Sequence, residues 1–256
     1  MITYTIEGQV GKIILNRPEK FNSFNREMSL LLQKTLKDCS SNENVRAVYI
    51  TGAGKAFSAG QDLSAAMSPD SPGIAAMVAE QYNPIILGIR NLEKPVVCAV
   101  NGVAAGAGAN IALACDIVVA GKSALFTQAF SKIALVPDSG GTYFLPRLIG
   151  LQKATALMML GDKISADEAQ LMGMIYKVFE DNDLERESWN IAVTLSEMPT
   201  RSLGLTKKLL NKSLNNSLEE QLSEEGKLQA LAGATDDFKE GVKAFLEKRK
   251  PDFKGE

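Results

Sequence analysis

The sequence contains no histidine among its 256 residues. This absence excludes Ser-His-Asp and Cys-His catalysis and most zinc sites, all of which depend on imidazole groups. Acid–base chemistry near neutral pH must then use Asp, Glu, Tyr, Lys or Cys side chains. The three cysteines, Cys39, Cys98 and Cys115, are scattered and have neither metal-site nor redox-pair spacing. We therefore expect no metal site and a reducing, cytoplasmic location.

Long apolar runs and an excess of basic residues are also missing. No run approaches the ~20 apolar residues of a membrane span, and residues 1–7 lack the basic-then-apolar pattern of a signal peptide. The net charge of −2 argues against a nucleic-acid-binding surface. We therefore expect neither a membrane nor a nucleic-acid partner. The chain is long enough for one large domain or two modest ones.

Strand patterns alternate with helix patterns in the first part of the chain. Strands are predicted at residues 2–6, 10–15, 45–51, 96–100, 116–120 and 125–126, and the longest helices there at residues 25–39 and 74–92. From Ser165 onwards the pattern is almost entirely helical. This order predicts an α/β fold with a parallel-type core and a helical extension.

Two turns rich in glycine and alanine follow predicted strands. Residues 101–110 lead from a buried strand into a helix, whose first N–H groups have no intrahelical partner. Residues 57–63 form a second such turn. Two N–H donors converging from two loops can stabilise a negatively charged oxygen. The alternative for the first turn is tight strand–helix packing, and its glycine spacing does not match a dinucleotide-binding loop.

Asp138 lies in a third turn, residues 135–141, which is rich in Pro and Gly. One interpretation makes Asp138 a proton-transferring carboxylate beside the glycine turns. The other makes it the N-cap of a helix that begins close behind it.

Several motifs in order resemble the crotonase (enoyl-CoA hydratase/isomerase) superfamily, over the whole chain. They are residues 16–18, 56–63, 94–102, 114–116, 137–142 and the tail 244–251. The resemblance implies a ββα spiral core that binds acyl-CoA, at residues 1–195, and a helical trimerisation region, at residues 196–256. It also implies an acyl-CoA thioester substrate and a homotrimer or dimer of trimers. CoA arrives as part of the substrate, so we expect no separate cofactor.

The resemblance assigns roles to four residues. The backbone amides of Gln61 and Ala107 match the two oxyanion-hole positions of the superfamily. Hydratases carry two catalytic glutamates where this chain has Asn110 and Phe130, so ordinary hydration is not expected. Asp138 matches the catalytic Asp of dienoyl-CoA isomerases and 4-chlorobenzoyl-CoA dehalogenases, but the dehalogenases also need a histidine. Asn110 either orients the substrate or Asp138, or only caps or lines its turn.

The pattern most resembles the superfamily's isomerases, which convert ring-1,2-epoxyphenylacetyl-CoA to oxepin-CoA or shift Δ3 double bonds to Δ2. Alternatives are a hydratase or dehydratase of an unusual acyl chain, including one on a carrier protein, and a non-catalytic CoA-ester-binding homologue.

The same resemblance implies a set of CoA contacts. They are Lys20, Phe21, Ala59, Gln61, Asp62, Leu63, Phe245 and Lys248. Asp62 is expected to brace its own loop, and Lys248 can instead be part of a solvated helix face. Tyr82 either lines the acyl pocket or only packs.

Overall fold

The computed structural model describes all 256 residues and pairs the strands into two sheets. The larger sheet has the spatial order β1 (Ile2–Glu7), β2 (Val10–Leu15), β3 (Ala47–Gly52), β5 (Val96–Val100), β7 (Ile117–Gly121) and β10 (Lys177–Phe179). Only the β1–β2 hairpin is antiparallel within it. The smaller sheet has the spatial order β4 (Ala56–Ser58), β6 (Val103–Ala105), β8 (Leu125–Thr127) and β9 (Lys163–Ser165), and β9 is antiparallel to β8.

The chain winds as a spiral because successive strands alternate between the sheets. β3, β5 and β7 each enter the larger sheet, and each is followed by a strand of the smaller one. All five residues of β5 are buried, as expected for a parallel strand covered on both faces. Val96, Cys98 and Val100 belong to the main core, whereas Val97 and Ala99 pack in a second cluster under α9 (Asp181–Ser196).

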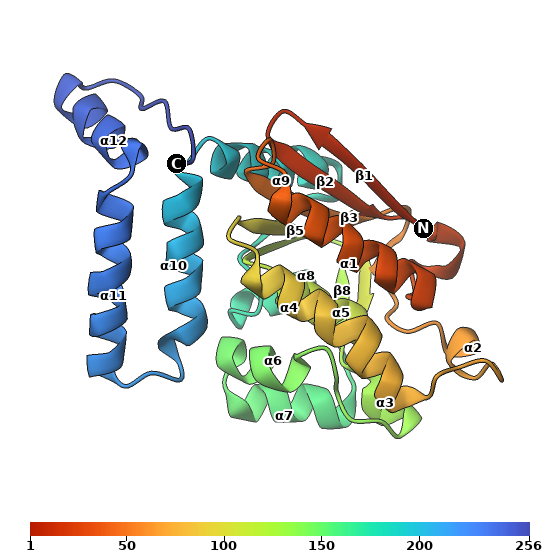
Figure 1. Cartoon of the computed structure of the whole chain (residues 1–256). Coiled ribbons are helices and arrows are strands. Elements are labelled where there is room, and N and C mark those ends of the chain that lie inside the picture. Colours follow the sequence, from red (N-terminus) through yellow and green to blue (C-terminus); the bar gives the residue numbers. More distant parts are fainter.

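Helices cover the remaining faces (Figure 1). They are α1 (Arg26–Ser41), α2 (Leu63–Ala66), α3 (Ile74–Met77), α4 (Asn83–Asn91), α5 (Ala107–Leu113), α6 (Gly141–Ile149), α7 (Leu151–Leu160) and α8 (Ala166–Leu171). Helix α1 begins where the Asn25 side chain accepts a hydrogen bond from the Met28 amide, and it buries Met28, Leu32 and Leu36.

The prediction of a single helix over residues 74–92 is wrong in one detail. A π-helical turn, Val78–Tyr82, separates α3 from α4. Pro84 has no N–H to donate to the carbonyl of Glu80, and that carbonyl instead accepts from Gln33 Nε2 at 2.8 Å. The π turn ends at Tyr82, which is 2% exposed.

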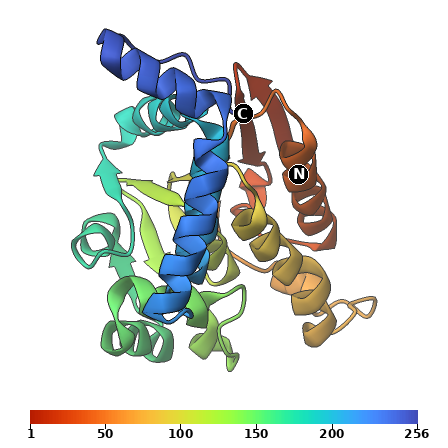
Figure 2. The ribbon, with the colours of Figure 1, turned by 60° about the vertical axis from the view of Figure 1, so that its left-hand side comes forward.

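Three helices, α10 (Thr200–Ser213), α11 (Leu218–Gly233) and α12 (Asp236–Glu247), form the end of the chain. Figures 1 and 2 show α11 running along the outside of the molecule, with α10 between it and the body in Figure 1. Lys207 of α10 anchors this region: its Nζ donates to Asp116 Oδ2 and to the Ile89 carbonyl, each at 2.7 Å. The predicted division at residues 195 and 196 lies in the last turn of α9 and stays a prediction.

None of the helices combines the length and the apolar character that crossing a membrane requires.

Candidate functional site

The two predicted glycine turns meet at Gly60. Gly60 has φ +86°, and a Cβ on it would stand 2.7 Å from the Ala105 carbonyl oxygen and 3.3 Å from the Ala107 nitrogen. Only glycine allows both this backbone conformation and this close approach. The turn after β4 therefore packs directly against the start of α5.

The N–H of Gln61 is held in one orientation by the neighbouring backbone. The Phe24 amide donates to the Gly60 carbonyl at 2.7 Å, and the Asp62 amide donates to the Phe24 carbonyl at 2.8 Å. The carbonyl and the N–H of one trans peptide point in opposite directions, so the Gln61 N–H points away from Phe24. It has no acceptor within the chain.

The N–H of Ala107 is free for a different reason, because Ala107 is the first residue of α5. Gly106, with φ +53°, accepts from the Asn110 amide at 3.1 Å, which fixes the Gly106–Ala107 peptide. At Gly108 a Cβ would stand 2.5 Å from the Ser58 carbonyl oxygen, so glycine is needed there too. The result is two unpaired N–H groups on two loops in contact, an arrangement that can bind a negatively charged oxygen.

Asp138 is half-buried in the turn before α6. Its Oδ1 accepts from Ser139 Oγ at 2.8 Å, and its backbone carbonyl accepts from the Gly141 amide at 2.9 Å. Gly140 occupies the N-cap position of α6, and no side chain caps that helix. The interpretation of Asp138 as a helix N-cap is therefore wrong.

Burial raises the pKa of Asp138 above its ordinary value of 3.8, although the hydrogen bond from Ser139 opposes that shift. A raised pKa makes the carboxylate a better proton acceptor. Burial also raises the pKa of Tyr82, and the charges of Asp138 and Asp62 add to this shift. Tyr82 is thus a neutral phenol near both carboxylates, and its hydroxyl donates to Gln61 Oε1 at 2.5 Å.

Asn110 is fully buried and contacts the Asp138 turn directly. Its Nδ2 donates to the Asp138 carbonyl oxygen at 2.8 Å, and its Oδ1 accepts from Gln128 Nε2 at 2.7 Å. Phe130 is 6% exposed, and its ring lies beside Gly106, where a Cβ would stand 3.6 Å from Cζ. Neither Asn110 nor Phe130 supplies a carboxylate here.

Most of the predicted CoA contacts lie next to one another. The Ala59 amide donates to the Phe21 carbonyl at 2.9 Å, which brings Lys20 and Phe21 beside the Gln61 turn. Asp62 braces this loop, as predicted: it pairs with Arg17 at 3.1 Å and caps the first turn of α2. Leu63, the first residue of α2, is 50% exposed.

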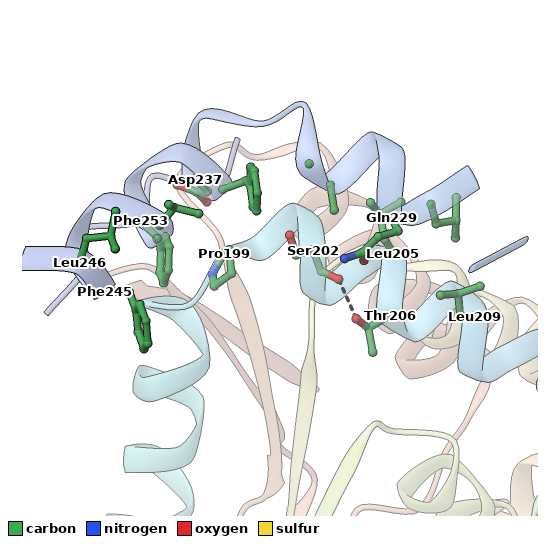
Figure 3. Close-up of a pocket in the computed structure, with 16 residues that line it drawn as sticks. Pro199, Ser202, Leu205, Thr206, Leu209, Gln229, Asp237, Phe245, Leu246 and Phe253 are labelled. Carbon is green, nitrogen blue, oxygen red and sulfur yellow. Dashed lines mark hydrogen bonds between the residues drawn. The ribbon is translucent and has the colours of Figure 1, made fainter. Parts of the chain in front are cut away.

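The structure does not bring Phe245 and Lys248 to this place within one chain. They belong to the end of α12, on the opposite side of the molecule from α2 (Figure 1). Phe245 is 83% exposed and lines a groove of about 490 Å³ between α10, α11 and α12 (Figure 3). Lys248 ends α12 with φ +53°. Their role in CoA binding stays a prediction.

Sequence reasoning missed Gln128 and Ser139, and left Tyr82 undecided. Ser139 is adjacent to Asp138, so its position next to the carboxylate was a signal that could have identified it. Gln128 bonds a residue 18 positions away, and no periodic pattern connects them.

Comparisons with known proteins agree along the whole chain. A family model described as enoyl-CoA hydratase/isomerase matches residues 5–256. The 1,2-epoxyphenylacetyl-CoA isomerase of Escherichia coli (strain K12) is 45% identical over 253 residues, 98% of this chain and 97% of that protein. A Rhodobacter capsulatus protein named as an enoyl-CoA hydratase is 41% identical over 254 residues, 99% of this chain and 98% of its own.

A crystal structure of an enoyl-CoA hydratase/isomerase from Mycobacterium abscessus has the same fold. Its TM-score is 0.94 at 36% identity, over 99% of both chains. The predicted crotonase-like α/β fold with helices at the C-terminus is therefore confirmed.

Proposed function

Since the chain belongs to the enoyl-CoA hydratase/isomerase family, we propose that it is an acyl-CoA isomerase. The N–H groups of Gln61 and Ala107 bind the thioester oxygen, and Asp138 moves the proton. CoA takes part only as a portion of the substrate.

The chemistry needs one carboxylate and one oxyanion hole. Asp138 takes a proton from the carbon α or γ to the thioester carbonyl, and the electrons of that C–H bond pass to the carbonyl oxygen as an enolate. Protonated Asp138 then returns the proton at a different carbon, and the carbonyl re-forms. Each N–H donor to the enolate oxygen contributes about 3–4 kcal/mol of transition-state stabilisation.

The observation that carries the proposal is the lone carboxylate. Asp138 is half-buried with a raised pKa, and its turn is bonded to α5, whose first N–H is free. Asn110 and Phe130 cannot act as general bases, and Asp62, the other carboxylate near Tyr82, is paired with Arg17 and caps α2. A single carboxylate supports proton shuttling rather than hydration.

The name of one relative supports the choice of substrate. The E. coli relative is named as a 1,2-epoxyphenylacetyl-CoA isomerase, and we extend that substrate, and Δ3-enoyl-CoA esters, to this chain. Lys20, Phe21, Ala59 and Leu63 contact the CoA portion.

Phe245 and Lys248 reach the CoA portion from a neighbouring copy, in a homotrimer or dimer of trimers. Their distance from the other contacts within one chain supports this arrangement.

The name of the R. capsulatus relative favours a second candidate, an enoyl-CoA hydratase. Incubating the enzyme with 2-enoyl- and 3-enoyl-CoA esters in water labelled with oxygen-18 and deuterium separates the two. Isomerisation moves the double bond without oxygen uptake, whereas hydration adds oxygen-18.

The Asp138→Asn variant completes this test. It should bind acyl-CoA and lose isomerisation, because an amide cannot accept the proton. Full turnover by this variant would overturn the proposal. Binding of acyl-CoA without proton exchange by the wild type would indicate the third alternative, a non-catalytic CoA-ester-binding protein.

A further inference from the structure

Gln128 is a buried side chain that the mechanism above does not use. It lies between β8 and the 3-10 turn Ala129–Ile133 and is 3% exposed. Its Nε2 donates to Asn110 Oδ1 at 2.7 Å, while no group of the protein donates to its Oε1. This orientation of the Gln128 amide gives Asn110 Oδ1 a donor and leaves Gln128 Oε1 without one.

The Asp138 carbonyl oxygen fixes the direction of the two hydrogen bonds that run from Gln128 through Asn110 to Asp138. The Asp138 backbone carbonyl can only accept, so Asn110 must turn Nδ2 towards it. Asn110 Oδ1 then faces Gln128, which must present its NH₂ group. If either amide were flipped, two acceptors or two donors would face each other in a buried place.

The Asp138 turn needs such support because its backbone is strained. Ser139 and Gly140 have φ +51° and +73°, two successive left-handed residues, and one of them is not glycine. Asn110 also sits tightly against the turn, since a Cβ on Gly141 would stand 2.4 Å from Asn110 Nδ2.

We propose that Gln128 is a positioning residue, which fixes the Asn110 amide and thereby holds the Asp138 turn at its place beside the free N–H groups. Gln128 does not touch the substrate in this account. The inference rests on the proposed function for its kinetic consequence, but its structural consequence can be measured without any turnover.

The test compares Gln128→Met, Asn110→Ala and the double variant with the wild type. Methionine keeps the length of glutamine and cannot donate. We expect kcat with a 3-enoyl-CoA ester to fall about 10- to 100-fold in Gln128→Met, because a small misplacement of a catalytic group has effects of that size. KM should stay close to the wild-type value. In the Asn110→Ala background the same substitution should have almost no further effect, since its route to Asp138 is gone.

Gln81→Met is the matched control. Gln81 is 1% exposed and its Oε1 also has no donor, so the substitution is chemically the same at a place without a bond to Asn110. This variant should keep the wild-type kcat.

Hydrogen–deuterium exchange of peptides covering residues 136–142 gives the readout that needs no activity. Exchange at the Gly141 amide, which bonds the Asp138 carbonyl, should be faster in Gln128→Met than in the wild type and in Gln81→Met. Unchanged exchange would overturn the inference, and so would an unchanged kcat or an equal loss of kcat in the Asn110→Ala background. If the wild type isomerises none of the substrates, the proposed function fails, and the exchange rates still decide the role of Gln128.

Discussion

A single methyl group at Gly60 should separate the two halves of the proposed oxyanion hole. In Gly60→Ala the new Cβ would stand 2.7 Å from the Ala105 carbonyl oxygen, whereas ordinary contacts begin at 3.4 Å. The turn carrying the Gln61 N–H and the start of α5 must therefore move apart by about 0.7 Å to relieve the overlap.

The expected effect on catalysis can be worked out from this displacement. Losing one oxyanion donor costs about 2.7–4 kcal/mol in the transition state, or roughly 10²–10³ in kcat. A shift of this size spoils one hydrogen bond, so we expect kcat to fall about 100-fold with little change in KM. Alanine at φ +86° also destabilises the folded state by about 1–2 kcal/mol.

Gly73→Ala is the control that isolates the backbone contribution. Gly73 has φ +85°, and a Cβ there would meet nothing within 4 Å. Urea unfolding should show a loss of stability in both variants, and the larger loss in Gly60→Ala, whose Cβ also overlaps the Ala105 carbonyl oxygen. Steady-state kinetics with a 3-enoyl-CoA ester should show a loss of kcat only in Gly60→Ala. If Gly60→Ala keeps its kcat, or if Gly73→Ala loses as much, the two turns do not form an oxyanion hole.

Three further predictions concern charges. Asp138→Asn should leave the free energy of unfolding at pH 7 unchanged or higher, because burial raises the native pKa of Asp138 and its ionised form therefore destabilises the folded state. Any gain measured by urea unfolding should vanish below the unfolded-state pKa, near 3.8, and a clear destabilisation at pH 7 would contradict this expectation. The kcat/KM of the wild type should fall with decreasing pH at a pKa above 3.8, as Asp138 becomes protonated; a profile flat down to pH 4 would exclude Asp138 as the base. Lys207→Met should lower the free energy of unfolding by about 2 kcal/mol, since it removes the more buried of two cations paired with Asp116, which keeps Arg90 at 3.3 Å; urea midpoints equal to the wild type would show that the Lys207–Asp116 pair does not stabilise the attachment of α10.

The parts of the site that follow local rules could be predicted from the sequence. Small residues between a buried strand and a helix place Ala107 at a helix start, where an N–H is necessarily free. The apolar run of β5 also predicted a buried strand, because a strand that is covered on both faces contains few polar residues.

Features that depend on distant partners could not be predicted. The π turn that ends at Tyr82 arises partly because Gln33, on another helix, accommodates the carbonyl left free by Pro84. The family resemblance gave orientation of Asp138 by Asn110 as one expectation, but the contact of Asn110 with Gln128 joins segments that no sequence spacing connects. The N-cap interpretation of Asp138 failed because Gly140 takes the cap position in a left-handed conformation.

The most direct test of the proposed function is the fate of a 3-enoyl-CoA ester in water labelled with oxygen-18, followed by mass spectrometry for the wild type and for Asp138→Asn. We predict that the wild type converts it to the 2-enoyl isomer without incorporating oxygen-18. Asp138→Asn should neither form this isomer nor incorporate oxygen-18. Oxygen-18 in a hydroxyacyl product, formed equally well by Asp138→Asn, would contradict the assignment of this site to a single-carboxylate isomerase.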